Sequence, residues 1–188
     1  MRFFHASHAR FAWKTPLPLR READSSGCSR AMARLIVFDL DLTLWHCAPL
    51  LWCDQLTPPL RRTESGQIFA SCRNEIRLYP EVPDMLARLT AEGHLLGLAS
   101  RTSAPEIARE LLDLFGIGHH FIHQQIYPGD KSAHFRALHE ETGIAFKDMI
   151  FFDDEHRNIE SVSRLGVASY LVTQGMSLTL LRKALGKV

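Results

Sequence analysis

Four short clusters of acidic, hydroxyl and basic side chains stand out in this 188-residue chain. They are Asp39-Leu40-Asp41-Leu42-Thr43, Ser100-Arg101-Thr102-Ser103, Lys131 and Asp153-Asp154-Glu155. Several carboxylates in one cleft repel one another unless a cation lies among them, and oxygen ligands in this number favour Mg²⁺. Lys, Arg and Ser are side chains that hold a phosphate dianion. If the clusters meet in the fold, their combination predicts phosphoryl transfer assisted by Mg²⁺.

The spacing of Asp39 and Asp41 suits a transfer in two steps. An aspartate carboxylate is a known nucleophile that forms an aspartyl-phosphate. A second carboxylate two residues later can protonate the leaving oxygen and afterwards activate water. The chain has no GxxxxGK[ST] sequence, which argues against nucleotide-loop ATPase chemistry, and no GxSxG sequence of a serine hydrolase.

The elements that must position these clusters are short apolar strands separated by helices. Apolar runs predict strands over residues 35–38, 95–99, 121–127, 149–152 and 168–172. Apolar spacing and end signals predict helices over residues 83–91, 104–115, 131–142, 159–165 and 177–185. This alternation implies right-handed crossovers and a parallel sheet that is covered on both faces. Ligands of such α/β sheets bind beyond the carboxyl ends of the strands, which is where the clusters stand.

An irregular stretch with several prolines, roughly residues 45–80, lies between the first strand and the first helix. Within it, residues 67–69 and 75–79 are predicted to pair as small strands. The stretch is long enough for a hairpin and a loop.

The net charge of +1 is a sum over two unlike parts of the chain. Residues 1–31 carry six basic and two acidic side chains, whereas the rest carries 16 basic and 19 acidic ones. We predict that residues 1–31 are a basic, disordered leader and that residues 32–188 form one folded domain. The Arg and Ser content of the leader also suits an organelle transit segment, and translation from an upstream start would make Met32 the true beginning.

Composition limits the remaining possibilities. Hydrophobic residues make up 46% of the chain and charged residues 23%, as in an ordinary globular protein. No stretch reaches the ~18 apolar residues of a membrane span. The four cysteines form no CxxC pair and the ten histidines lack a matching ligand cluster, so no zinc site is predicted. Free thiols fit a reducing compartment, so we expect a cytoplasmic protein. We also expect a monomer rather than an oligomer, and no nucleic-acid or membrane partner.

Taken together, the four clusters resemble the motif pattern of the haloacid dehalogenase (HAD) superfamily of phosphatases. The agreement extends to other blocks, which resemble the eukaryotic-type magnesium-dependent phosphatases of that superfamily over about residues 34–185. These blocks are Leu44-Trp45, Leu78-Tyr79-Pro80-Glu81-Val82-Pro83, Ile126-Tyr127-Pro128-Gly129 and Gly175-Met176-Ser177-Leu178. The resemblance implies a three-layer, Rossmann-like α/β fold with a minimal cap hairpin and hydrolysis through an aspartyl-phosphate. Many members of the superfamily have a large cap domain over the site. Here the resemblance implies only a small cap insertion over about residues 45–80, and therefore a shallow, open site.

The resemblance also implies a role for each matching position. Asp39 would be the nucleophile and a Mg²⁺ ligand, and Asp41 would be the general acid and base, with its backbone carbonyl on the metal. Asp154 would complete the metal site, with Asp153 and Thr43 in support, although the choice between the two neighbouring aspartates stays open. The phosphate would be held by the Leu40 backbone, Asp41, Ser100, Arg101 and Lys131.

The choice of substrate stays open at this point. Leu42 and the run His46-Cys47-Ala48 depart from the aromatic residues expected of close relatives, and both flank the site. The resemblance implies protein phosphotyrosine and phosphorylated sugars or fructosamines, with another small metabolite as the alternative. A dehalogenase would need neither Asp41 nor Asp154, and a phosphomutase or kinase-like transferase would need a larger cap to exclude water. A non-catalytic binding module of the same fold is the alternative from another class, and the intact Asp39 and Asp41 argue against it.

Overall fold

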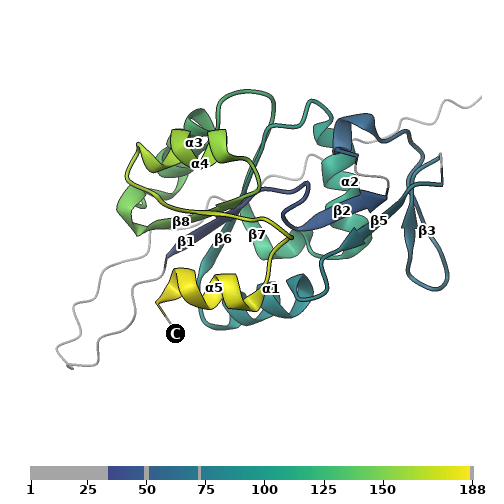
Figure 1. Ribbon diagram of the computed structural model, residues 1–188, viewed down its shortest axis with the longest axis horizontal. Helices are drawn as coiled ribbons and strands as arrows, with labels where there is room; N and C mark the ends of the chain where they lie inside the picture. The colour runs from purple at the N-terminus through teal and green to yellow at the C-terminus, as the bar shows by residue number, and fades with distance from the viewer. Residues whose placement is uncertain (1–33, 49–50, 72, 187–188) are drawn as a thin grey trace, which may run out of the picture. The chain divides into compact units, whose positions relative to one another are not determined.

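The computed structural model describes residues 34–48, 51–71 and 73–186 (Figure 1). The predicted leader over residues 1–31, with its transit-segment alternative and the question of Met32, lies outside the described residues. Within the described part, no helix is long and apolar enough to cross a membrane.

A five-stranded parallel sheet forms the centre of the domain, with strand order β7-β6-β1-β8-β9. The strands are β7 (Phe121–Ile126), β6 (Leu95–Ser100), β1 (Leu35–Phe38), β8 (Met149–Asp153) and β9 (Ala168–Leu171). The predicted strands and their parallel pairing are confirmed. The middle strand, β1, pairs with β6 on one side and with β8 on the other. The carboxyl ends that deliver the first, second and fourth clusters are therefore direct neighbours.

Two layers of helices cover the sheet. The helices are α1 (Val82–Ala91), α2 (Pro105–Phe115), α3 (Lys131–Thr142), α4 (His156–Ser163) and α5 (Leu178–Leu185). Because side chains alternate along a strand, Ile36 and Phe38 of β1 pack into one core cluster with residues of α1, α2 and α5. Leu35 and Val37 pack into the other cluster, with residues of α3 and α4. The three-layer α/β fold is confirmed.

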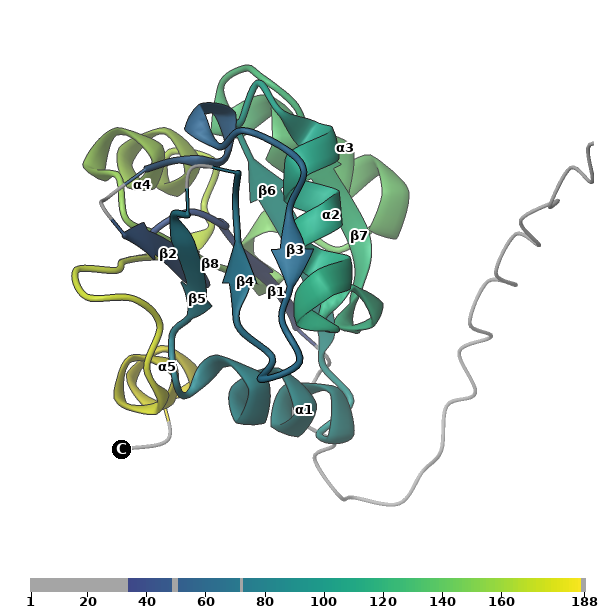
Figure 2. The ribbon, with the colours of Figure 1, turned by 90° about the vertical axis from the view of Figure 1, so that its right-hand side faces the viewer.

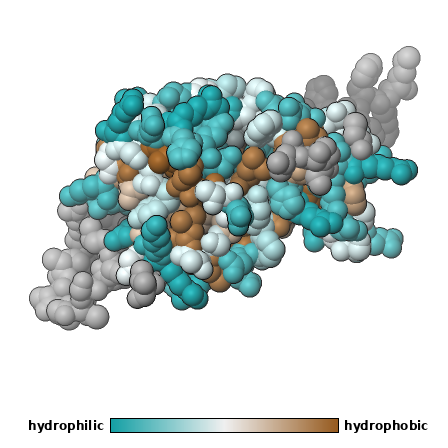
Figure 3. Space-filling model, viewed as in Figure 1, coloured by the Kyte–Doolittle hydropathy of each residue, from teal (hydrophilic) through white to brown (hydrophobic). Residues whose placement is uncertain are grey.

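The surface agrees with this layered arrangement. Figure 1 shows α3 and α4 on one side of the sheet and α1 and α5 on the other. On the face seen in the same view, hydrophilic residues cover much of the surface, and hydrophobic residues gather toward its middle (Figure 3). Helix α4 begins three residues before the predicted start, because its first turn, His156-Arg157-Asn158, is polar and gives no apolar spacing.

The cap insertion is larger than the single hairpin expected. It is a four-stranded antiparallel sheet of order β2-β5-β4-β3 (Figure 2). Its strands are β2 (Trp45–Ala48), β3 (Arg61–Arg62), β4 (Ile68–Phe69) and β5 (Glu75–Leu78), and the 3₁₀ helix η1 (Cys53–Gln55) follows β2. The predicted hairpin is β4 and β5. Sequence reasoning missed β2 and β3, whose short runs carry no clear alternation of apolar and polar residues.

The cap is joined to the main domain by packing as well as by the chain. The ring of Trp45 stacks on Phe115 at the end of α2, with 5.8 Å between ring centroids. The first strand of the cap is thus held against the end of helix α2. In the main domain, two further 3₁₀ helices, η2 (Gly118–His120) and η3 (Phe146–Asp148), precede β7 and β8.

Candidate active site

A cavity of about 540 Å³ opens at the carboxyl ends of β1, β6 and β8. Six of the side chains predicted for the site line it: Asp39, Asp41, Ser100, Arg101, Lys131 and Asp154. The structure therefore brings together residues that lie up to 115 positions apart in the sequence.

Lys131 is the buried cation at the base of this cavity. It is the first residue of α3, and Asp130 caps that helix by accepting a hydrogen bond from the Ser132 backbone N–H at 2.8 Å. Its Nζ donates to Oδ1 of Asp39 at 2.5 Å and also to the carbonyl of Ala99. The Lys131 side chain is 1% exposed, so its charge is neutralised by protein groups rather than by water.

Asp39 leaves the end of β1, where its backbone N–H donates to the Phe152 carbonyl at 2.9 Å. Burial raises the pKa of its carboxyl group well above the ordinary value, the hydrogen bond and charge of Lys131 oppose this rise, and the charges of Asp153 and Asp154 add to it. The cluster thus holds more negative charge than Lys131 alone can balance.

The two neighbouring aspartates after β8 have different surroundings. Asp153 is fully buried, and its carboxylate accepts from Lys131 at 3.0 Å, from the Glu155 backbone N–H at 2.8 Å and from Asn158 Nδ2 at 2.9 Å. Asp154 lines the cavity instead, and burial followed by the charge of Asp153 raises its pKa to about 7. Asp153 therefore fixes Lys131, while Asp154 presents its carboxylate to the cavity.

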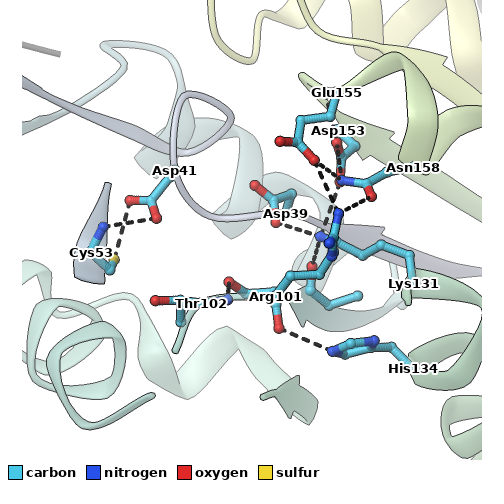
Figure 4. Close-up of polar contacts among 12 residues, drawn as sticks. Asp39, Asp41, Cys53, Arg101, Thr102, Lys131, His134, Asp153, Glu155 and Asn158 are labelled. Carbon is cyan, nitrogen blue, oxygen red and sulfur yellow. Dashed lines mark hydrogen bonds and ion pairs between the residues drawn. The ribbon is translucent and has the colours of Figure 1, made fainter. Parts of the chain in front are cut away.

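Asp41 sits in a tight turn between β1 and the cap. Leu42, the next residue, has a φ of 58°, a left-handed conformation that is uncommon for a residue other than glycine. Its N–H donates to the Trp45 carbonyl at 2.7 Å, which closes the turn. The Asp41 carboxylate points toward Cys53 on the cap side, whereas Asp39 points toward Lys131 (Figure 4). Burial raises the pKa of Asp41, and hydrogen bonds from Cys53 and Trp45 oppose the rise.

Arg101 connects the loop before α3 with the start of α4 at the cavity wall. Its Nε donates to the Gly129 carbonyl at 2.7 Å, and its Nη1 lies 3.2 Å from Asn158 Oδ1 and 3.4 Å from Glu155 Oε2. Ser100 ends β6 and is nearly buried, with its hydroxyl accepting from the Thr102 backbone N–H at 3.4 Å. Together they place a guanidinium and a hydroxyl on the wall of the cavity.

Besides Asp153, two of the predicted residues do not line the cavity. Leu40 is fully buried, and its carbonyl accepts the Leu44 N–H at 2.8 Å within the turn. Thr43 is also fully buried; its carbonyl accepts the Met176 N–H at 2.9 Å, and its hydroxyl has no hydrogen-bond partner among the described residues. Both residues shape the turn that carries Asp41.

The donor set of the cavity fits a hard divalent cation. Within the described residues, no three His, Cys, Asp or Glu side chains form a metal-binding group by themselves. Mg²⁺ does not need such a group, because it is usually held by one or two carboxylates together with water and substrate phosphate. Asp39 and Asp154 provide two carboxylates with raised pKa values at one cavity, which is the charge pattern that a cation would relieve.

Several residues of the site gave no signal in the sequence. Asn158 bridges Asp153 and Glu155, and His134 is fully buried with Nε2 near the carbonyls of Ser100 and Tyr127. Trp52, Asp54 and Gln55 line the cavity from the cap. Asn158 and His134 are single polar residues within helices, and residues 52–55 lie in a stretch without a regular pattern. No spacing in the sequence identifies such residues as part of a site. Only the fold brings them to the cluster.

The fold and the cavity define a class of proteins. A parallel α/β sheet whose middle strand ends in an Asp-x-Asp pair, beside a buried lysine and an acidic pair, is the arrangement expected of HAD-type phosphatases. The family model described as Acid Phosphatase matches residues 31–188. The chain belongs to this family, and its resemblance to the magnesium-dependent phosphatases of the HAD superfamily is confirmed.

Individual relatives agree with this assignment. The chain is 45% identical over 155 residues to human magnesium-dependent phosphatase 1, across 82% of this chain and 86% of the relative. It is 36% identical over 146 residues to a HAD-like hydrolase superfamily protein of Schizosaccharomyces pombe, across 71% and 82% of the two chains. A HAD family enzyme of Bacteroides thetaiotaomicron, solved with magnesium and inorganic phosphate, has the same fold, with a TM-score of 0.58 at 16% identity across 79% of this chain and 98% of that one.

Proposed function

We propose that this protein is a magnesium-dependent phosphomonoester hydrolase that works through an aspartyl-phosphate on Asp39. The observation that carries the proposal is the meeting of Asp39, Asp41, Lys131 and Asp154 at one cavity. The human relative that is 45% identical bears the name of a magnesium-dependent phosphatase, which supports the choice of cation.

The metal would be held by the side chains of Asp39 and Asp154 and by the backbone carbonyl of Asp41. When bound, Mg²⁺ supplies positive charge that offsets the repulsion between these carboxylates and the phosphate oxygens. Asp153 would act indirectly, because its hydrogen bonds to Lys131, Glu155 and Asn158 hold the neighbouring groups in place.

The reaction would proceed in two steps, transfer of the phosphoryl group to Asp39 and its hydrolysis. In the first, an Asp39 oxygen attacks phosphorus, the ester P–O bond breaks, and Asp41 gives its proton to the leaving oxygen. In the second, Asp41 takes a proton from water, the resulting hydroxide oxygen bonds to phosphorus, and the bond between Asp39 and phosphorus breaks. Inorganic phosphate and an alcohol are the products. Lys131, Ser100, Arg101 and the Leu40 backbone would hold the phosphoryl oxygens, and the Thr43 backbone would keep the turn in shape.

The substrates proposed for this site are protein phosphotyrosine and phosphorylated sugars or fructosamines. Trp52 on the cap is 47% exposed and lines the cavity beside Asp54 and Gln55. An exposed aromatic face suits a phenyl ring as well as the apolar face of a sugar, and the polar neighbours suit hydroxyl groups. A location in the cytoplasm stays a prediction, as does a monomeric state.

The test is a phosphatase assay with Mg²⁺ on phosphotyrosine peptides, phosphoserine peptides and sugar phosphates. We expect hydrolysis by the wild-type protein, loss of activity with EDTA and its return with Mg²⁺. Asp39→Asn should abolish turnover while leaving the circular dichroism spectrum and melting temperature near those of the wild type. Asp113→Asn, the same change on the exposed face of α2, is the control and should keep full activity. Turnover by Asp39→Asn, or turnover that EDTA does not reduce, would refute the mechanism.

A further inference from the structure

Three hydrogen bonds from the start of the cap converge on the carboxylate of Asp41. Cys53, the first residue of η1, donates from its backbone N–H to Oδ2 at 3.0 Å and from its Sγ to Oδ1 at 3.1 Å. Trp45 donates from Nε1 to Oδ1 at 2.8 Å. Both donor residues are buried, with exposures of 0% and 1%. The two residues thus form a cradle around one carboxylate (Figure 4 shows Cys53).

We propose that Cys53 is a positioning residue for Asp41, acting with Trp45 to fix the carboxylate that serves as general acid and base. The inference rests on the proposed function, because it assigns a task to a residue that touches the proposed acid rather than the substrate. Cys53 itself does not line the cavity, so its effect on the reaction would pass through Asp41.

The thiol acts here as a hydrogen-bond donor rather than as a nucleophile. Burial and the charge of Asp41 raise the pKa of the Cys53 thiol, which keeps the proton on sulfur. A buried cysteine most often serves only as a small apolar side chain. In this case, both its backbone and side-chain donors face the same carboxylate, which packing alone does not require.

The cradle also distinguishes the two oxygens of Asp41. A carboxylate has about four acceptor positions, two on each oxygen. Among the described residues, Oδ1 accepts from Trp45 and Cys53, whereas Oδ2 accepts only from the Cys53 backbone. Oδ2 therefore keeps one position for the proton that is delivered to the leaving oxygen. Loss of the thiol would leave Oδ1 with Trp45 as its single donor and would weaken the restraint on the orientation of the carboxylate.

A positioning role for Cys53 predicts a kinetic effect that a purely structural role would not produce. Protonation by a general acid matters most when the leaving oxygen is strongly basic, as in an alkyl phosphate, and least for a nitrophenyl phosphate. The value of kcat/KM reports the steps up to the first irreversible one, here the transfer to Asp39. Cys53→Ala should therefore lower kcat/KM for phosphoserine by roughly three- to tenfold, the effect of one lost hydrogen bond, and hardly change it for nitrophenyl phosphate.

The experiment measures kcat/KM with saturating Mg²⁺ for nitrophenyl phosphate, phenyl phosphate and phosphoserine. The proteins are the wild type, Cys53→Ala, Cys53→Ser and Cys47→Ala, the last removing the same atoms from another buried position in the cap. We expect a steeper dependence on the leaving group in Cys53→Ala, recovery in Cys53→Ser, which keeps a donor, and a wild-type dependence in Cys47→Ala. Trp45→Phe removes the second donor and should steepen the dependence as well, so the test survives if one variant fails to fold.

The proposal would be overturned if Cys53→Ala lowered kcat/KM equally for all three substrates, or if Cys53→Ser behaved like Cys53→Ala. Such results would leave the phosphatase assignment intact, because that assignment depends on the wild-type rate and on Asp39→Asn. A wild-type protein without Mg²⁺-dependent turnover would instead refute the proposed function itself.

Discussion

Replacement of Lys131 by methionine tests the electrostatic account of the cluster most directly. Its Nζ lies 2.5 Å from Asp39 Oδ1 and 3.0 Å from Asp153 Oδ2, and the side chains of the two aspartates are 12% and 0% exposed. Methionine keeps most of the volume but leaves two nearly buried carboxylates without their cation. Loss of one partner from a buried ion pair costs about 3–5 kcal/mol. We therefore expect a loss of this size in the free energy of unfolding, together with loss of activity.

The assay is urea unfolding of the metal-free protein followed by tryptophan fluorescence. With an m-value of about 2 kcal/mol/M, the midpoint should fall by roughly 1.5–2.5 M urea at pH 8. The deficit should shrink at pH 5, because the pKa of Asp39 is already raised by burial and would rise further without Lys131. A group with a raised pKa in the folded state stabilises the fold at acid pH and loses that contribution as the pH rises.

Two further variants make the result specific. Lys147→Met is the same change at an exposed position and should shift the free energy of unfolding by no more than about 0.5 kcal/mol. Adding Asp39→Asn to Lys131→Met should restore part of the lost stability, because it removes one of the two stranded charges. A midpoint within about 0.5 M urea of the wild type, or a deficit that is the same at pH 5 and pH 8, would refute the reasoning.

Two other predictions concern the cation and the loop before α5. Burial raises the pKa of Asp154 to about 7, and Mg²⁺ requires the ionised carboxylate. The affinity for Mg²⁺, measured by calorimetry, should therefore increase up to about pH 7 and level off above it. Equal affinities at pH 5 and pH 8 would contradict this prediction. Gly175 has a φ of 77°, and the Cβ added in Gly175→Ala would lie 2.2 Å from the Tyr79 ring. The free energy of unfolding, measured by urea denaturation, should therefore fall by about 2–5 kcal/mol. A fall below about 1 kcal/mol would argue against the close packing of these two residues.

Much of the main domain was predictable because its signals are local. Each strand is a short apolar run, and the apolar residues of helices such as α2 share one face. The residues that follow the strands carry the chemistry, and a parallel sheet places the carboxyl ends of its strands at one edge, so the clusters that contain Asp39, Ser100 and Asp154 were expected near one another. Their placement around one cavity follows from strand order, whereas their roles stay predictions.

The cap and the support of the site were less accessible, because they depend on contacts between distant residues. Strand β2 exists through its pairing with β5, in which Trp45 lies opposite Leu78. The contacts of Asn158 with Asp153 and Glu155 depend on where α4 begins, and that polar turn has no apolar period. The hydrogen bonds from Cys53 to Asp41 join residues that lie 12 positions apart, with strand β2 between them. No propensity or spacing rule reports such contacts.

The 3₁₀ helix η1 and the residue before it perform two tasks with consecutive residues. Trp52 and Asp54 form part of the cavity wall, where Asp54 also accepts from the Ser103 hydroxyl at 3.3 Å, while Cys53 between them holds Asp41. A substitution or an insertion that reshapes the wall for a new substrate would therefore also move the carboxylate of Asp41, the proposed general acid. Under this proposal, substrate selectivity and reactivity are coupled because the residues responsible are adjacent in the chain, so evolution or directed mutagenesis of this loop would have to change both together.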